Sequence, residues 1–280
     1  MSRRLFLLGG ALCATPGIAF FDKVLPTLRR MGMSGSRPVS VARNLAVSDV
    51  LTQSQFPAEW PFSAADFARQ DETTDTGFYS APRFCFHVDD AAVGALTEHY
   101  AEAFKAWDDP DILDLCASHV SHFPKAIDKT TPGRRVALGM NEDELKLNEQ
   151  VGEYVVKDLN ADPTLPFDDD SFDVVTNVVS IDYLTRPREI CAEVARVLRP
   201  GGVAMFALSN RCFPTKAINI WLRTNDLEHV FIVGSYFHYS GKFKPPSAVE
   251  VSPNQATTPW AGGQSQNIAY LAVVSATVDK

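Results

Sequence analysis

Side chains suited to proton transfer or to anion binding follow several segments that the sequence predicts to be strands. They are His119 and His122 after the first strand, Asp182 and Tyr183 after the fourth, and Arg211 after the fifth. A histidine or a carboxylate in such a place can act as a general base. An arginine can hold an acidic substrate group through two parallel hydrogen bonds. Further candidates of the same kinds are Ser209, Asn210, Tyr236 and His238.

A metal centre is the second chemistry that these residues could support. His119 and His122 are three residues apart, but no third ligand follows at a fitting spacing, so a hydrogen-bonded surface pair is favoured. The run Asp168-Asp169-Asp170 is interpreted as a solvated turn. Cys116 has no accompanying Cys-His-Asn order, and the five cysteines form no CxxC pair. The sequence therefore predicts free thiols, no nucleophilic cysteine and no metal site.

From about residue 85 onward the chain alternates predicted strands and helices. Apolar residues at three- and four-residue spacing predict a helix over 89–107, and Pro187 begins another that Pro200-Gly201-Gly202 should end. Shorter helices are expected at 142–149, with Asn141 as its cap, and at 213–223. The expected strands are 111–115, 136–139, 153–157, 172–179, 203–208, 229–233 and 268–276. This alternation indicates an α/β fold with a doubly wound sheet, whose ligands bind beyond the carboxyl ends of the strands.

Two motifs stand in register with this pattern. One runs from Leu165 to Val175 as LPFDDDSFDVV, and the other runs from Arg196 to Gly202 as RVLRPGG. In this order the chain resembles the class I S-adenosylmethionine-dependent methyltransferases, most of all the branch called methyltransferase type 11, over roughly residues 96–210. The resemblance implies a mostly parallel, seven-stranded, Rossmann-like sheet and S-adenosyl-L-methionine as the cofactor.

The resemblance also implies where the cofactor would bind. In the family, the first strand ends in an acid followed by a glycine-rich turn, and here that segment begins at Asp114 and contains no glycine. If the turn needs positive φ, His119 or Val120 would be strained. The family's ribose-binding acid falls at Gly139, and Asn141 or Glu142 is the expected substitute. The residues carried over are Asp114, Cys116, Ser118, Met140, Asn141, Asp158, Leu159, Asn177 and Val178, of which Asp158 matches the acid that accepts from the adenine amino group.

The function expected from the sequence is methyl transfer to a small molecule, with the general base left open. One alternative is a non-catalytic methyltransferase-like scaffold that has lost cofactor binding, with a crevice filled by side chains such as His119 and Met140. Another is a nicotinamide-dependent oxidoreductase, which would need a GxGxxG turn that this chain lacks. The aromatic stretch from Phe231 to Tyr239 could wall an acceptor pocket or pack in the core.

The distribution of charged and apolar residues disfavours two kinds of partner, nucleic acid and the lipid bilayer. The chain has 280 residues and a net charge of -8, and residues 1–48 hold seven basic side chains and one acidic side chain. The rest is therefore strongly acidic, which disfavours nucleic acid as a partner. No apolar run after the first is long enough to cross a bilayer, so no stable membrane insertion of the mature domain is expected.

The N-terminus is interpreted as a targeting leader. Ser2-Arg3-Arg4 precedes a short apolar run and then a basic, serine-containing stretch. This pattern is typical of a signal followed by a plastid transit peptide, while a twin-arginine export signal or an uncleaved anchor are the alternatives. The predicted organisation is a leader at 1–48, an aromatic N-terminal cap segment at 49–95 and a methyltransferase-like domain at 96–280.

Overall fold

The computed structural model describes residues 46–53, 56–252 and 269–280. Two compact units are distinguished, and every element below lies in the unit formed by residues 45–54 and 62–280. The predicted leader falls almost wholly outside the described residues.

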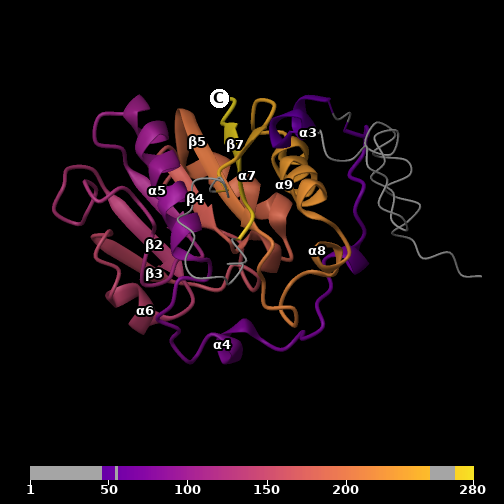
Figure 1. Cartoon of the computed structure of the whole chain (residues 1–280), viewed down its shortest axis with the longest axis horizontal. Helices are drawn as coiled ribbons and strands as arrows, with labels where there is room; N and C mark the ends of the chain where they lie inside the picture. The colour runs from indigo at the N-terminus through magenta and orange to yellow at the C-terminus, as the bar shows by residue number, and fades with distance from the viewer. Residues whose placement is uncertain (1–45, 54–55, 253–268) are drawn as a thin grey trace, which may run out of the picture. The chain divides into compact units, whose positions relative to one another are not determined.

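A seven-stranded sheet organises this unit (Figure 1). Its order is β3-β2-β1-β4-β5-β7-β6, and β7 is antiparallel to both of its neighbours while the pairings among β1 to β5 are parallel. The strands are β1 (Ile112–Leu115), β2 (Arg135–Gly139), β3 (Glu153–Val156), β4 (Phe172–Val178), β5 (Leu198–Ser209), β6 (Ser247–Glu250) and β7 (Leu271–Thr277). The predicted fold class, a doubly wound and mostly parallel sheet, is confirmed.

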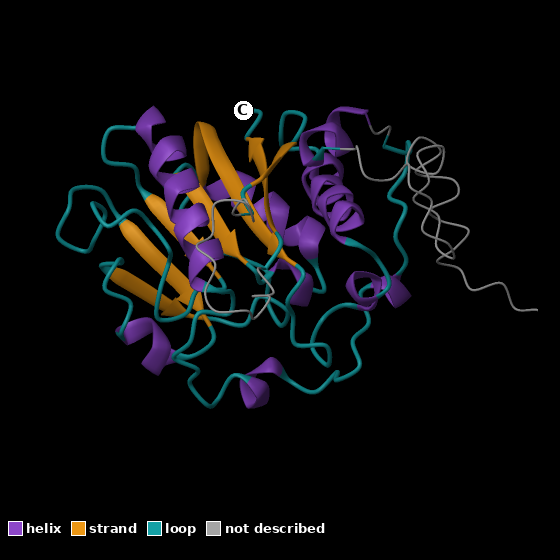
Figure 2. Cartoon of the chain, viewed as in Figure 1, coloured by secondary structure: helices purple, strands orange, loops and turns teal. Residues whose placement is uncertain are grey.

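Helices cover both faces of the sheet (Figure 2). The helices are α3 (Val47–Gln53), α4 (Asp75–Phe78), α5 (Asp90–Ala103), α6 (Glu142–Lys146), α7 (Pro187–Val197), α8 (Asn219–Leu222) and α9 (Asp226–Ser240). On one face, α5 buries Leu96 and Tyr100 against alternate strand residues such as Ile112 and Val174. On the other face, Phe237 of α9 packs on Phe206 of β5 with ring centroids 4.8 Å apart.

Most predicted strands form where the apolar runs placed them, and one does not. The segment 229–233 is the middle of α9 and not a strand. Asn225 accepts from the Glu228 amide, the Glu228 side chain accepts in return, and Gly241 ends the helix with a φ of 66°. Residues 229–237 are all buried, so the helix is apolar all round and lacks the one-sided pattern that identifies surface helices. Tyr236 and His238 consequently lie on a helix and do not follow a strand.

Three further differences concern element boundaries. The helix predicted over 213–223 is reduced to the four residues of α8, and α6 ends at Lys146, short of the predicted Glu149. Pro200-Gly201-Gly202 does not end α7, which stops at Val197, but lies inside β5, where the pairing with β4 is irregular. Gly201 has a φ of 81°, and a Cβ on Gly202 would lie 2.9 Å from the Arg199 carbonyl oxygen. These glycines therefore permit a bulge.

Two further observations concern the part of the chain that is described. Cys85, Cys116, Cys191 and Cys212 are free thiols. No described helix combines the length and the apolarity needed to cross a bilayer.

We predict that Asn225→Ala lowers the free energy of unfolding by about 0.5–2 kcal/mol, because the first turn of α9 loses its cap. Asn225→Ser keeps an oxygen at the cap and should stay close to wild type. Urea unfolding followed by circular dichroism measures both. Equal stability of the two variants would contradict the helical start at this residue.

Candidate functional site

A cavity opens at the carboxyl ends of the parallel strands. Its wall is made by the loops that follow β1, β2, β3, β4 and β5, together with a segment between Asp75 and Val88. The space between these side chains amounts to about 1380 Å³, including the part open to solvent. The cavity therefore lies where α/β sheets of this kind bind ligands.

The structure brings most of the sequence-predicted site residues to this one cavity. Those on its wall are Asp114, Cys116, Ser118, His122, Met140, Asn141, Asp158, Leu159, Val178, Tyr183 and Arg211. Three others are not on the wall. Asn177 lies beneath it and donates from Nδ2 to the Leu115 carbonyl oxygen at 3.1 Å, and Asp182 is 2% exposed. His119 instead stacks on Phe86, with ring centroids 6.0 Å apart.

The loop after β1 bends against the end of β2. The Ala117 amide donates to the Leu138 carbonyl oxygen at 2.9 Å. A Cβ placed on Gly139 would lie 2.1 Å from the Ala117 carbonyl oxygen, which is closer than any real contact. The acid that the family resemblance places at Gly139 is therefore excluded by the backbone of the loop.

The left-handed residues of this loop differ from those expected. Positive φ angles occur at Cys116 (57°) and His122 (56°), and neither His119 nor Val120 adopts one. Cys116 lies in the segment that the resemblance aligns with the glycine-rich turn, and its backbone has the conformation that a glycine favours. A non-glycine residue in that conformation costs about 1–2 kcal/mol.

Glu144 is a cavity residue that sequence reasoning missed. Ser118 donates from Oγ to its Oε2 at 2.7 Å, and the Arg83 amide donates to its Oε1 at 2.7 Å. Glu142, one of the two expected substitutes for the ribose acid, is not on the wall and pairs with Lys146 at 3.1 Å. The helix that begins at the predicted cap, Asn141, points its third residue into the cavity. Capping at Asn141 was the only sequence signal for that direction.

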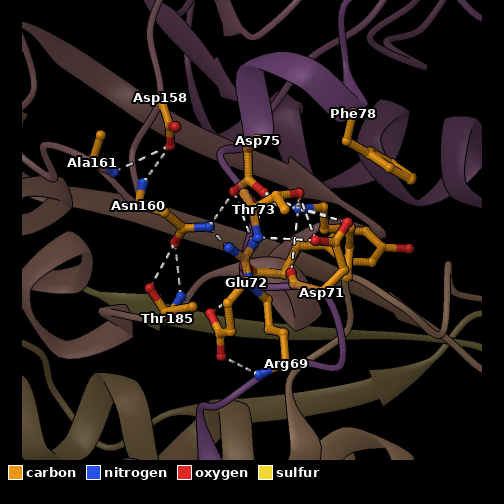
Figure 3. A network of polar contacts seen from close by, with 12 residues as sticks. Arg69, Asp71, Glu72, Thr73, Asp75, Phe78, Asp158, Asn160, Ala161 and Thr185 are labelled. Atoms are coloured by element: carbon orange, nitrogen blue, oxygen red, sulfur yellow. Dashed lines mark hydrogen bonds and ion pairs between the residues drawn. The ribbon is translucent and has the colours of Figure 1, made fainter.

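Asp158 and the turn after β3 form the other end of the cavity (Figure 3). Asp158 Oδ1 accepts from the amides of Asn160 and Ala161 at 2.9 and 3.2 Å. Asn160 donates from Nδ2 to Asp75 at 2.8 Å, and its Oδ1 accepts from the Thr185 amide at 2.8 Å. The turn is thus fixed by hydrogen bonds before any ligand arrives.

A buried ion cluster holds the segment from Arg69 to Arg83, which we call the strap, across the cavity. Arg69 donates from Nη1 to both oxygens of Asp75 at 2.8 Å (Figure 3). Lys216, fully buried, lies 3.2 Å from both Asp71 and Asp75 and donates to the Thr73 carbonyl oxygen at 2.7 Å. Burial would raise the pKa of Asp75, but hydrogen bonds from Arg69 and Asn160 hold it below the usual value. The strap thereby brings Tyr79 and Arg83 to the cavity.

Three titratable groups in or beside the cavity have pKa values shifted from their ordinary values. Burial raises the pKa of Asp114 to about 7 although Thr176 donates to it at 2.8 Å. Burial also raises the pKa of Asp182 to about 8, and its Oδ2 has no hydrogen-bond partner among the described residues. Burial lowers the pKa of His122 to about 4. At neutral pH the His122 imidazole is therefore neutral, and its buried Nδ1 has no partner in the described parts of the chain.

In the comparison with known protein families, residues 123–206 match the model of the methyltransferase domain family. The match takes in β2 to β4 and most of β5 but begins after β1 and its loop. The resemblance to class I S-adenosylmethionine-dependent methyltransferases that the sequence suggested is confirmed.

Curated relatives match over short stretches. A phthiotriol/phenolphthiotriol dimycocerosates methyltransferase of Mycobacterium tuberculosis is 56% identical over 43 residues, 15% of this chain and 16% of that protein. A demethylmenaquinone methyltransferase of Clavibacter sepedonicus is 41% identical over 70 residues, 24% of this chain and 29% of that protein. The matched segments thus span less than a third of these relatives.

Solved structures align with this chain at low sequence identity. A putative S-adenosylmethionine-dependent methyltransferase from Listeria monocytogenes aligns with 69% of this chain and 100% of its own, at 13% identity and a TM-score of 0.48. The [4+2]-cyclase SpnF aligns with 65% of this chain and 80% of its own, at 14% identity and a TM-score of 0.46.

We predict that Gly139→Ala lowers the free energy of unfolding by about 1–3 kcal/mol, because the new Cβ meets the backbone of the loop after β1. Gly139→Asp, which restores the family's acid, should destabilise at least as much. Gly152→Ala is the matched control, since nothing lies within 4 Å of the added Cβ there. Urea unfolding compares the three variants, and a Gly139→Ala curve equal to that of the control would disprove the close approach.

Proposed function

We propose that this chain is an S-adenosylmethionine-dependent methyltransferase that methylates a small, largely apolar molecule. The observation that carries the proposal is the open cavity at the carboxyl ends of β1 to β5, in a chain whose central segment matches the methyltransferase domain family. The scaffold alternative expected a crevice plugged by side chains. His119 lies outside the cavity, and Met140 lies on its wall with open space beside it.

The residues present fit the cofactor at the adenine end. Asp158 uses Oδ1 to fix its own turn, and the same carboxylate can accept from the adenine amino group. Leu159 and Met140 offer apolar contacts to the ring from the same wall. At the ribose end, Glu144 and Ser118 are hydrogen-bonded to each other on the cavity wall, and we assign them the place of the missing acid.

When bound, the cofactor supplies an activated methyl group for in-line displacement, so the task of the chain is to position the acceptor and to remove a proton where the acceptor requires it. His122 is the candidate that we assign to take that proton, because its side chain lines the cavity and its imidazole is neutral at neutral pH. Tyr183 is unsuited to be a base, since burial raises its pKa far above the usual range.

The apolar character of the acceptor rests on the cavity and on the relatives. Side chains such as Val88, Leu138, Leu184 and Phe213 contribute to the wall. The two curated relatives are named for phthiotriol dimycocerosates and for demethylmenaquinone. A molecule with an apolar body and one methylatable oxygen, nitrogen or carbon is the substrate class that fits.

Isothermal titration with S-adenosylhomocysteine tests the proposed cofactor. We predict binding to the wild type and a roughly tenfold loss of affinity in Asp158→Ala, because one hydrogen bond to the ligand is lost. Asp168→Ala is the control, since Asp168 is exposed and lies outside the cavity wall. Absence of both heat and a thermal shift at millimolar ligand would remove the enzyme and leave the scaffold.

We further propose that residues 1–48 deliver the protein to an organelle, most consistent with a plastid, on the basis of their apolar and then basic composition. Fusion of residues 1–48 to a fluorescent protein should direct it to plastids in an alga with complex plastids. Export of the fusion by the twin-arginine route in bacteria, without plastid import, would reverse this assignment.

A further inference from the structure

Arg83 is held rigidly in the cavity wall by aromatic rings. Its guanidinium carbon lies 4.6 Å from the centre of the Phe78 ring, 5.5 Å from that of Phe213 and 5.9 Å from that of Tyr79. Nη2 donates to the Phe78 carbonyl oxygen at 3.0 Å. The side chain therefore has a fixed plane and a fixed direction, which a flexible surface arginine lacks.

One end of this guanidinium is buried without a partner. Nη1 of Arg83 is inaccessible to solvent and makes no hydrogen bond with the described residues. The other lysine and arginine side chains on the cavity wall are paired, Lys157 with Asp162 at 2.6 Å and Arg211 with Asp89 at 3.3 Å. Because Nη1 is covered by the protein itself, a ligand can reach this guanidinium only from the cavity side, where Arg83 lines the wall.

The carboxylates around Arg83 are already committed to other partners. Glu144 accepts from Ser118 Oγ and from the main-chain amide of Arg83, not from its guanidinium. Asp75 accepts from Arg69 and Asn160 and pairs with Lys216. The positive charge of Arg83 thus faces the cavity without a counterion from the described chain.

We propose that Arg83 is a receptor for a carboxylate group inside the cavity. A planar guanidinium binds a carboxylate through parallel, charge-assisted hydrogen bonds, and the surrounding rings exclude water that would weaken them. The inference rests on the proposed function, because the carboxylate would come from one of the two ligands of a methyltransferase. One is the amino-acid end of the cofactor, and the other is an acidic methyl acceptor.

The test compares wild type with Arg83→Met, which keeps an unbranched apolar stem among the rings and removes the charge. Four probes are titrated by calorimetry: S-adenosylhomocysteine, 5′-methylthioadenosine, which lacks the amino-acid carboxylate, benzoate, and its neutral isostere benzamide. We expect the variant to lose about tenfold to a hundredfold in affinity for at least one carboxylate probe, as for hydrogen bonds to charged groups. The two neutral probes should bind it as they bind wild type.

The pattern of losses identifies the source of the carboxylate. A loss for S-adenosylhomocysteine assigns Arg83 to the cofactor, and a loss for benzoate alone assigns it to the acceptor. Equal affinity of variant and wild type for both carboxylates, or no binding of either to wild type, overturns the proposal. If wild type binds neither nucleoside probe but binds benzoate through Arg83, the proposed function fails while the carboxylate site stands.

Two controls separate binding from folding. Arg188→Met removes an exposed arginine of α7 that is not on the cavity wall and should leave all four affinities unchanged. Arg83→Lys retains the charge without the planar fork and should bind carboxylates with intermediate affinity. An unfolded Arg83→Met would show in its near-ultraviolet circular dichroism, in which case the Lys variant alone decides through its loss relative to wild type.

Discussion

The close approach of the loop after β1 to the end of β2 is the constraint on which the rest of the cavity depends. With the Ala117 carbonyl oxygen where a side chain at 139 would begin, that position admits only glycine. The same bend sets Cys116 in a left-handed conformation and turns Ser118 toward Glu144. The close approach therefore accounts for the absent ribose acid but not for the absent family glycines, because Cys116 keeps a backbone conformation that favours glycine.

The second constraint is electrostatic. A lysine as deeply buried as Lys216 is stable only if its desolvation is offset by close partners, and Asp71, Asp75 and the Thr73 carbonyl oxygen provide them. These partners belong to the strap, whereas Lys216 follows β5. The ion cluster therefore fixes a segment with little regular structure at a set place over the strand ends. Tyr79 and Arg83 reach the cavity because of it.

The sequence predicted those parts of the fold that depend on residues close together in the chain. β-Branched runs such as 172–178 identified strands, and the cap at Asn141 and the proline at 187 identified helix starts. α9 was mistaken for a strand because a fully buried helix shows no amphipathic period, and the mostly exposed β6 has no apolar run. Glu144 and Arg83 could not be found in this way, since their roles come from contacts with Ser118, 26 residues away from Glu144, and with Phe213.

Buried polar atoms without a hydrogen-bond partner among the described residues occur on the cavity wall and also elsewhere, for example at Tyr100 Oη and Arg135 Nε. Buried donors and acceptors in folded proteins are almost always paired, because each unpaired one costs free energy. Arg83 Nη1 and His122 Nδ1 are both buried and unpartnered among the described residues, and both side chains line the same cavity. Such atoms therefore do not distinguish the cavity from the rest of the protein, and the proposed binding site rests on the place of the cavity at the carboxyl ends of the strands and on the fixed guanidinium of Arg83 in its wall. The strained backbone at Cys116 and His122 lies on the same wall, where strain is expected if the site is kept for its function.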